Sequence, residues 1–417
     1  MNTVTILENS SQDMISLEDK YGAHNYHPLP VVLARGEGVY VWDVEGKKYY
    51  DFLSAYSAVN QGHCHPKIVN AMINQAKTLT LTSRAFYNDQ LGPYEKFITE
   101  YFGFDKVLPM NTGAEAVETA IKLCRKWAYE RKGIPEQQAQ IIVCDGNFHG
   151  RTTTIISFSN DENARKNFGP YTPGFINIAY DNLEALENAL ASNANIAGFL
   201  VEPIQGEAGV YVPADGYLAK AKALCEKNNV LFIADEVQTG IARTGKLLAV
   251  NHENVQPDIL ILGKALSGGV YPVSVVLAND DIMNVIKPGQ HGSTFGGNPV
   301  AAAVAVAALE VIKEEKLAEN SAYLGEIFRK KLNDYIRTSN IVTLVRGKGL
   351  LNAIVINDTE ESATAWNICM ALRDNGLLAK PTHGNIIRFA PPLVMTEEQL
   401  LDCVSIIITT LKEFEIK

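Results

Sequence analysis

Three side chains with reactive groups stand directly after apolar runs in the middle of the chain. Glu202 follows "IAGFLV", Asp235 follows "LFIA" and Lys264 follows "ILILG". In an open α/β sheet, ligands bind beyond the carboxyl ends of the parallel strands, so we expect these three residues at one site. Burial and nearby positive charge lower the pKa of a lysine, which then acts as an amine nucleophile and as a proton carrier.

Asp235 and Lys264 admit two interpretations. A carboxylate at the end of an apolar strand costs desolvation energy unless a cation compensates it, so the two residues can form a buried ion pair. Pyridoxal phosphate chemistry uses the same two groups, because a lysine forms a Schiff base with this cofactor and an acid keeps its pyridine nitrogen protonated. The residue types alone leave both interpretations open.

The stretch "MNTGAEAVETAIKLCRKWA", residues 110–128, predicts a long helix with a marked beginning. Thr112 and Glu115 have the spacing of a capping box, and Gly113 lets another group approach the backbone closely. The free N–H groups at such a helix start can hold a phosphate. An ordinary capped helix without a ligand is the alternative interpretation.

Two other motifs give weaker evidence for a ligand site. "GIARTGKL", residues 240–247, has the glycine and lysine spacing of a phosphate loop, but Leu247 stands where serine or threonine would bind magnesium. The chain also lacks the GxGxxG pattern of a dinucleotide site. "GHCH", residues 62–65, offers metal ligands without a second cluster, so a turn before a helix is favoured over a metal site.

The elements that must position these residues form an α/β pattern. Continuous apolar runs separated by amphipathic segments, such as the predicted helix at 215–229, indicate a mainly parallel sheet that is covered on both faces. The predicted strands are 141–144, 196–202, 230–236, 259–263 and 273–278.

The two ends of the chain differ from the middle. Residues 31–53 predict a small antiparallel meander, and residues 315–417 alternate long helices with brief strands. We therefore expect a large domain at 61–310. A smaller domain would combine an N-terminal segment, 1–60, with the C-terminal part, 311–417.

Composition and charge limit the function classes. With 417 residues, 47% of them hydrophobic, and a net charge of −10, the chain is typical of a globular protein and has no basic stretch for a nucleic acid. The six cysteines are scattered, which favours a reducing compartment. The first 20 residues lack a targeting pattern and no apolar stretch is long enough to span a bilayer, so we expect a cytoplasmic protein without membrane association.

An ordered series of motifs resembles the class III, fold type I family of pyridoxal-phosphate-dependent aminotransferases over essentially the whole chain. Within that family the resemblance is greatest to members that act on the δ-amino group of ornithine. Two positions depart from the usual pattern, His149 and Val117, and neither is expected to touch the core chemistry. The motifs are "YGAHNYHPLP", "DFLSAYSAVNQGHCHPKI", "NTGAEAVETA", "NFHGRT", "VEPIQGEAGV", "DEVQTGIARTGK", "LGKALSGG", "GSTFGGNP" and "IIRFAPPL".

The resemblance implies an aspartate-aminotransferase-like α/β fold and roles for residues around pyridoxal 5'-phosphate. Lys264 would be the Schiff-base lysine and Asp235 the partner of the pyridine nitrogen. The ring would stack on Phe148, and the remaining contacts would come from Gly113, Ala114, Gln238, Ser293 and Thr294. Because the last two would reach the phosphate of the neighbouring subunit, a homodimer with shared sites is expected.

The resemblance also implies a substrate site. Arg151 would bind the carboxylate far from the reacting amine, and Arg388 the carboxylate beside the reacting carbon of 2-oxoglutarate. Glu207 would pair with Arg388 while ornithine is bound. Tyr26 would contact the α-amino group of ornithine and Tyr56 would shape the adjacent wall, with a packed aromatic side chain as the alternative interpretation of either residue. The implied reaction converts ornithine and 2-oxoglutarate to glutamate 5-semialdehyde and glutamate. N-acetylornithine or 4-aminobutyrate as amine donor, and a non-catalytic binding protein, are the alternatives.

Overall fold

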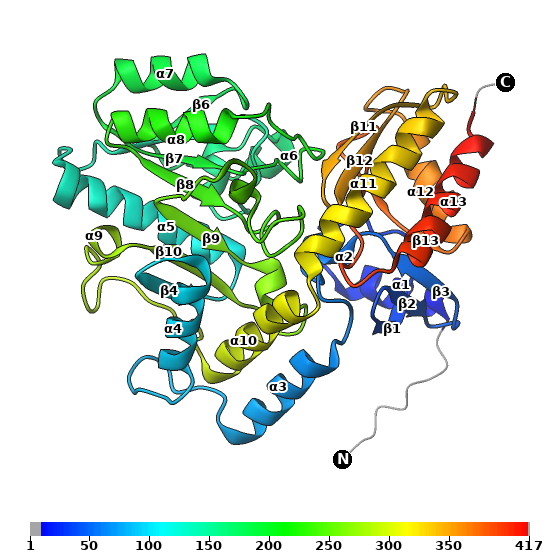
Figure 1. The fold of residues 1–417 in the computed structure, drawn as a ribbon, viewed down its shortest axis with the longest axis horizontal. Helices are drawn as coiled ribbons and strands as arrows, with labels where there is room; N and C mark the ends of the chain where they lie inside the picture. Colours follow the sequence, from blue (N-terminus) through cyan, green and yellow to red (C-terminus); the bar gives the residue numbers. More distant parts are fainter. Residues whose placement is uncertain (1–9, 416–417) are drawn as a thin grey trace.

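The computed structural model describes residues 10–415, and a sheet of seven strands forms its centre (Figure 1). The strand order is β4-β10-β9-β8-β7-β5-β6. Strand β10 is antiparallel to both of its neighbours, and the other pairs in the sheet are parallel, which confirms the predicted mainly parallel sheet. The strands are β4 (Lys106–Met110), β5 (Gln140–Cys144), β6 (Phe175–Ile178), β7 (Ile196–Val201), β8 (Leu231–Asp235), β9 (Ile259–Leu262) and β10 (Ser274–Ala278).

Both faces of this sheet are buried, as the continuous apolar runs predict. Ile233 and Ile261 pack with residues of α5 (Gly113–Trp127), while Phe232 and Leu260 belong to the core on the other face. Successive side chains of a strand point to opposite faces, so a run without polar interruptions requires a cover on each side. The other helices around this sheet are α4 (Leu91–Phe102), α6 (Glu162–Arg165), α7 (Leu183–Ser192), α8 (Tyr217–Lys227), α9 (Asp280–Met283) and α10 (Pro299–Glu314).

Two smaller sheets lie to one side of the large one (Figure 1). The predicted meander is present, and a strand from the far end of the chain, β13, pairs with β3 in parallel. The N-terminal segment and the C-terminal part therefore share a sheet. The strands are β1 (Leu33–Glu37), β2 (Tyr40–Asp43), β3 (Lys48–Asp51) and β13 (Leu377–Leu378), and β11 (Val342–Lys348), β12 (Leu351–Ile356), β15 (Ile386–Phe389) and β14 (Lys380–Thr382).

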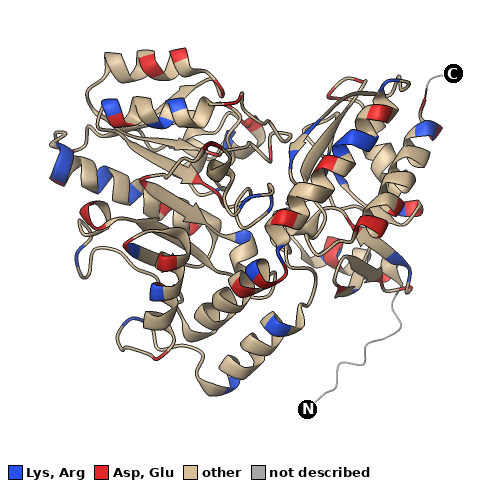
Figure 2. Ribbon diagram, viewed as in Figure 1, with Lys and Arg blue, Asp and Glu red and all other residues tan. Residues whose placement is uncertain are grey.

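The helices of this smaller part come from both ends of the chain. They are α1 (Ser11–Tyr21), α11 (Leu317–Ile336), α12 (Thr364–Asp374) and α13 (Glu397–Glu413). Along the outer helices, Lys and Arg are interspersed with Asp and Glu (Figure 2). Among the helices of residues 10–415, none is sufficiently long and apolar to cross a bilayer. The expectation that the first 20 residues carry no targeting signal concerns in part residues 1–9, which lie outside the described residues.

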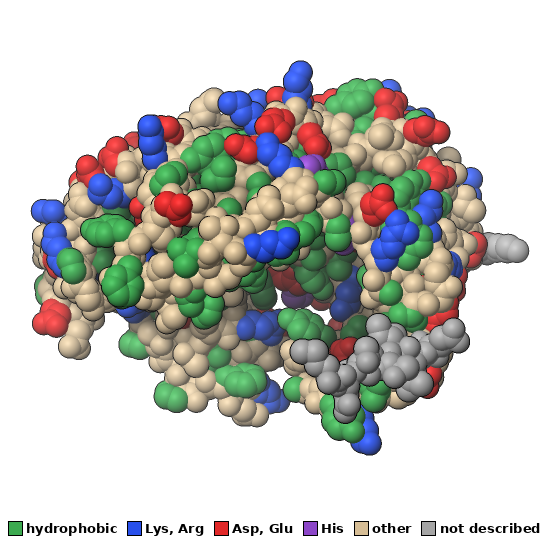
Figure 3. Space-filling model, turned by 90° about the horizontal axis from the view of Figure 1, so that it is seen from below, with side chains coloured by type: hydrophobic (Ala, Val, Ile, Leu, Met, Phe, Trp, Pro, Cys, Tyr) green, Lys and Arg blue, Asp and Glu red, His purple; other side chains and the backbone are tan. Residues whose placement is uncertain are grey.

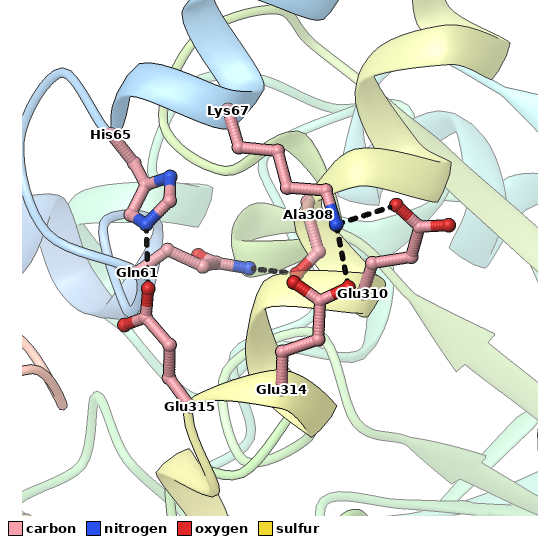
Figure 4. Close-up of polar contacts among 7 residues, drawn as sticks. All are labelled: Gln61, His65, Lys67, Ala308, Glu310, Glu314 and Glu315. Atoms are coloured by element: carbon pink, nitrogen blue, oxygen red, sulfur yellow. Dashed lines mark hydrogen bonds and ion pairs between the residues drawn. The ribbon is translucent and has the colours of Figure 1, made fainter.

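Polar contacts fasten the segment that enters the large sheet region to the end of α10 (Figure 4). Lys67, in α3 (Pro66–Thr78), lies 2.9 Å from Glu310 and 2.7 Å from Glu314. His65 lies 2.9 Å from Glu315, and the buried Gln61 amide donates to the carbonyl of Ala308 at 3.2 Å. The "GHCH" segment is thus the connection into α3 that the sequence favours.

Candidate active site

An inner cavity of about 190 Å³ lies at the carboxyl edge of the large sheet. The structure brings Glu202, Asp235 and Lys264 together here, because the ends of β7, β8 and β9 meet at this edge. The other residues of the lining are Gly113, Ala114, Phe148, His149, Gly150, Val237, Gln238 and Thr239. The cavity therefore combines an amine, two carboxyl groups, an aromatic ring and a helix start.

Lys264 stands at the first position of a short 3-10 helix, Lys264–Ser267, with a left-handed φ of 43°. This conformation is unfavourable for a residue with a side chain and persists only where the surroundings impose it. Burial, together with the charge of Arg388, lowers the pKa of Lys264 to about 8, although Glu207 and Asp235 oppose the shift. Near neutral pH the amine is thus available both as a nucleophile and as a proton carrier.

Asp235 is held by groups other than Lys264. Its Oδ1 accepts the N–H of Val237 at 3.0 Å, and its Oδ2 lies 2.6 Å from His149 Nδ1. Across the part of the chain that the structure describes, no ion pair joins Asp235 to Lys264. Both residues instead border the inner cavity, so the simple buried ion pair is not the arrangement observed.

The expectation that His149 does not touch the core chemistry is wrong. Its ring is fully buried and contacts Asp235 directly. Burial acts to lower the pKa of His149, but the hydrogen bond and charge of Asp235 outweigh it, and the pKa is raised. The imidazole of His149 and the carboxyl group of Asp235 therefore form a hydrogen-bonded pair that borders the cavity. The other departure, Val117, is a buried core residue of α5.

Glu202 is the carboxyl group for which the resemblance implied no role. Its Oε1 accepts the N–H of Phe148 at 2.8 Å, so the carboxyl group holds the residue whose ring borders the cavity. Burial is the largest influence on Glu202 and raises its pKa to about 7. Its position directly after an apolar strand was the sequence signal for it.

The start of α5 supplies a site for an anion. Thr112 accepts the N–H of Glu115 at 3.2 Å, and the Glu115 carboxylate accepts the N–H of Thr112 at 3.1 Å, which confirms the predicted capping box. Gly113 and Ala114 then border the cavity with N–H groups that precede the helical hydrogen-bond pattern. A methyl group on Gly113 would lie 3.0 Å from the Val237 side chain, so the packing there is already close.

Ser293 and Thr294 lie elsewhere. Ser293 Oγ accepts from the side chain of Asn111 at 2.8 Å, and Thr294 is exposed. Within the described chain, neither residue is part of the lining of its own inner cavity. Their place on the surface is compatible with contact to another copy of the chain.

An outer pocket of about 940 Å³ shares Phe148, His149 and Gly150 with the inner cavity. The substrate residues implied by the resemblance all border it, namely Tyr26, Tyr56, Arg151, Glu207 and Arg388. On the face seen from below, the molecule is hollowed, and acidic, basic and histidine side chains lie in the hollow (Figure 3). The outer pocket can admit a small molecule with charged ends.

Arg388, on β15, is the buried cation of this pocket. Its Nη1 donates to Glu207 Oε2 at 3.0 Å and to the carbonyl of Gly206 at 3.0 Å. The guanidinium carbon lies 4.9 Å from the centre of the Tyr56 ring. Burial acts to raise the pKa of Glu207, but Arg388 outweighs this effect and lowers it. Glu207 is therefore an anion that neutralises Arg388.

Arg151 and Tyr26 stand at the mouth of the outer pocket. The Arg151 guanidinium lies 3.7 Å from Asp161 and 5.7 Å from the ring centre of Phe148, with 57% of its side chain exposed. Tyr26 is 73% exposed. Both side chains are thus free to turn toward a ligand, in contrast to the buried Arg388.

The inner cavity fits a planar aromatic cofactor that carries an aldehyde and a phosphate. Lys264 presents the amine, Asp235 the acid, the start of α5 the anion site, and Phe148 the stacking surface. Among the described residues, the buried Nε2 of His149 has no hydrogen-bond partner, so the hydrogen bond that holds this ring is the one between Nδ1 and Asp235.

Residues 21–411 match the model of the family Aminotransferase class-III. A mitochondrial ornithine aminotransferase of Drosophila ananassae is 64% identical, with 96% of this chain and 91% of the relative covered. The ornithine aminotransferase of Plasmodium falciparum is 57% identical, and the match covers 97% of each chain.

Solved structures agree with this result. The acetylornithine aminotransferase of Elizabethkingia anophelis is 66% identical, with a TM-score of 0.90 over 97% of this chain and 100% of that one. The ornithine aminotransferase of Toxoplasma gondii ME49 is 50% identical, with a TM-score of 0.95 over 97% and 96%. The predicted fold type I architecture is confirmed. The chain thus belongs to the class III aminotransferases and is a pyridoxal-phosphate-dependent aminotransferase.

Proposed function

We propose that the chain transfers the δ-amino group of L-ornithine to 2-oxoglutarate and forms glutamate 5-semialdehyde and glutamate. The observation that carries this proposal is the ion pair of Arg388 and Glu207 in the outer pocket. A donor that reacts through a terminal amino group places no carboxylate beside the reacting carbon. Without Glu207, Arg388 would then be a buried cation without an anionic partner, which is strongly unfavourable.

The same pair accommodates the second substrate. A 2-oxo acid places a carboxylate beside the reacting carbon, and a carboxylate can bind a guanidinium through two parallel hydrogen bonds. Glu207 is 32% exposed in its side chain, so it can move into the open pocket while Arg388 stays on β15. Arg151 would bind the distal carboxylate of either substrate.

The inner cavity would hold pyridoxal phosphate. Lys264 would bind its aldehyde carbon through Nζ, Asp235 would hold the proton of the pyridine nitrogen, and the start of α5 would bind the phosphate. Phe148 would stack on the ring and Gln238 would face its hydroxyl side. When bound, the cofactor accepts the electron pair released at the substrate carbon and keeps the amino group between the half-reactions.

Lys264 would also carry the proton. A pKa of about 8 means that Nζ is neither fully protonated nor fully neutral near physiological pH. Once a substrate amine has taken its place, the neutral Nζ would take the proton from the δ-carbon of ornithine and deliver it to the cofactor carbon. The hydrogen bonds of Asp235 to His149 and Val237 keep the opposite side of the cavity fixed during this step.

A second candidate donor is N-acetylornithine, since a structure of 66% identity is that of an acetylornithine aminotransferase. Relatives at 57–64% identity over nearly their full length are ornithine aminotransferases, which favours the free amino acid. 4-Aminobutyrate is the third donor to compare.

The deciding experiment offers the three donors in competition, with 2-oxoglutarate as acceptor, and identifies the products by mass. Glutamate 5-semialdehyde from ornithine is the expected main product. A clear preference for N-acetylornithine, or for 4-aminobutyrate, would overturn the choice of substrate while leaving the class of reaction intact.

The assembly would be a homodimer in which Ser293 and Thr294 complete the phosphate site of the partner. Large apolar side chains are exposed next to Thr294, with Phe295 at 49%, and in the segment between α3 and α4, with Phe86 at 74% and Tyr87 fully exposed. Hydrophobic side chains also gather on the face seen from below (Figure 3). Exposed aromatic residues of this size are typical of protein interfaces.

A cytoplasmic location remains part of the proposal. Several relatives, among them those of Drosophila ananassae and Rattus norvegicus, are mitochondrial by name. Fractionation of cells followed by detection of the protein would decide between the two compartments.

A further inference from the structure

A strained turn presents Tyr56 to Arg388. Residues 54–57 have φ values of 49°, 46°, 59° and 72°, so four consecutive residues with side chains are left-handed. Each such residue is disfavoured because its Cβ approaches the backbone carbonyl, and runs of them are not self-supporting. The Tyr56 ring at the end of this turn lies 4.9 Å from the guanidinium carbon of Arg388.

The side chains of the turn do not stabilise it. The hydroxyls of Ser54 and Ser57 are buried and, within residues 10–415, have no hydrogen-bond partner. Local serine bonds to the backbone, which often support turns, are therefore absent from this part of the described chain. Another group must compensate the strain.

We propose that Asp51 is a positioning residue that clamps this turn and thereby places Tyr56 against Arg388. Asp51 ends β3 and is 7% exposed. Its Oδ1 accepts the N–H groups of Leu53, the residue before the turn, at 2.8 Å and of Ser54, the first residue of the turn, at 2.9 Å. Its Oδ2 lies 2.7 Å from His63 Nε2, which fixes the carboxylate from the other side.

The residue of this turn that borders the outer pocket is Tyr56. Neither Asp51 nor His63 borders the outer pocket among the described residues, whereas Tyr56 does. Tyr56 lies over the guanidinium of Arg388. Under the proposed function, on which this inference rests, Arg388 binds Glu207 while ornithine is present and a substrate carboxylate while 2-oxoglutarate is present. A released turn would withdraw the Tyr56 ring from the wall of the outer pocket beside the bound ornithine, so the donor would bind more weakly.

The test compares the holoenzyme with Asp51→Ala and Asp51→Asn. The amide oxygen of asparagine still accepts both N–H groups, so this variant should stay near the original protein. In Asp51→Ala, loss of hydrogen bonds to a charged group predicts about tenfold faster amide hydrogen exchange over residues 53–59 and about tenfold higher KM for ornithine, with kcat changed less.

Asp43→Ala is the matched control. Asp43 is 9% exposed, lies in the same small sheet, and accepts the N–H of Lys47 at 2.8 Å and the hydroxyl of Tyr49 at 2.6 Å. Its loss should lower stability without changing exchange at 53–59 or the KM. If it raises the KM as Asp51→Ala does, the effect is general destabilisation and the clamp is refuted.

His63→Ala is the second variant, should Asp51→Ala not fold. This variant removes only the contact of His63 with the Asp51 carboxylate. Amide hydrogen exchange over residues 53–59 should therefore rise by a smaller factor, about threefold, as for the loss of one ordinary hydrogen bond. Unchanged exchange in either variant would overturn the clamp. If the original protein fails to use ornithine at all, the proposed function falls, while the exchange rates still decide whether Asp51 holds the turn.

Discussion

At the scale of single residues, the site depends on pairs of buried charges rather than on isolated groups. Arg388 pairs with Glu207, and Asp235 pairs with His149. Breaking one member of such a pair leaves an uncompensated charge in a medium of low polarity. Lys264 has no such partner in the described chain, and burial together with the charge of Arg388 lowers its pKa to about 8. Two predictions belong to this scale.

Glu207→Ala should weaken the discrimination between the δ-amino and α-amino groups of ornithine. In this variant, Arg388 lacks its carboxylate partner during the first half-reaction. Arg388 can then bind the α-carboxylate of ornithine, which brings the α-amine to the reacting position. We expect about a tenfold change in the ratio of the two products, the effect of one charged hydrogen bond. Product analysis checks this, and unchanged regioselectivity would contradict the role of Glu207. Glu360→Ala, at the border of the same pocket, is the control.

His149→Phe should destabilise the protein most at low pH. Because the pKa of His149 is raised in the folded state, the stabilisation from its pairing with Asp235 is present at low pH and is lost as pH rises through that raised pKa. Removal of one partner of a buried pair costs about 3–5 kcal/mol. Urea unfolding of both proteins at several pH values measures the difference, which should shrink toward alkaline pH. A difference that grows with pH would contradict an imidazolium at this position.

At the scale of elements, one helix start and several strand ends create the site. The apolar runs of β7, β8 and β9 predict where Glu202, Asp235 and Lys264 must emerge, since a strand is recognisable within a few residues. The capping box of α5 is equally local and was predicted correctly. The left-handed turn at 54–57 gave no such signal, because no glycine marks it.

Thr112→Ala should weaken both the fold and the binding of the cofactor phosphate. Loss of the cap costs about 0.5–2 kcal/mol of stability and disorders the N–H groups of Gly113 and Ala114. Thr396→Ala is the control, because Thr396 forms the same capping box with Gln399 at the start of α13, away from the site. Both variants should lose similar stability in urea unfolding. Only Thr112→Ala should release pyridoxal phosphate more readily, and equal release would contradict a phosphate at α5.

At the scale of the whole molecule, the site lies where the large sheet meets the smaller part. Arg388 comes from β15 of a small sheet, while Glu207 and Gln238 follow strands of the large one. Any movement of the smaller part relative to the large sheet would change the distances from Arg388 to Glu207 and Gln238. The proposed dimer adds a further set of groups, from Ser293 and Thr294 of a second copy.

Mixed dimers test the shared site. Lys264→Ala and Thr294→Glu should each be nearly inactive alone, the first without the amine and the second with a repelling charge beside the phosphate. In a shared-site dimer, one site of each mixed dimer has both intact residues, so about a quarter of the activity should return after random exchange of subunits. If mixing restores nothing although mixed dimers are shown to form by mass, each site belongs to one chain.

The sequence by itself determined the local features: strand ends, the capped start of α5 and the small antiparallel meander. These depend on patterns within a few residues, and the family resemblance added expected roles to particular positions. The tertiary structure decided which distant residues touch. Arg388 pairs with Glu207 across 181 positions and His149 with Asp235 across 86. The contact of His149 could not be predicted, because a histidine among aromatic residues becomes a charged partner only when packing places a carboxylate beside its ring.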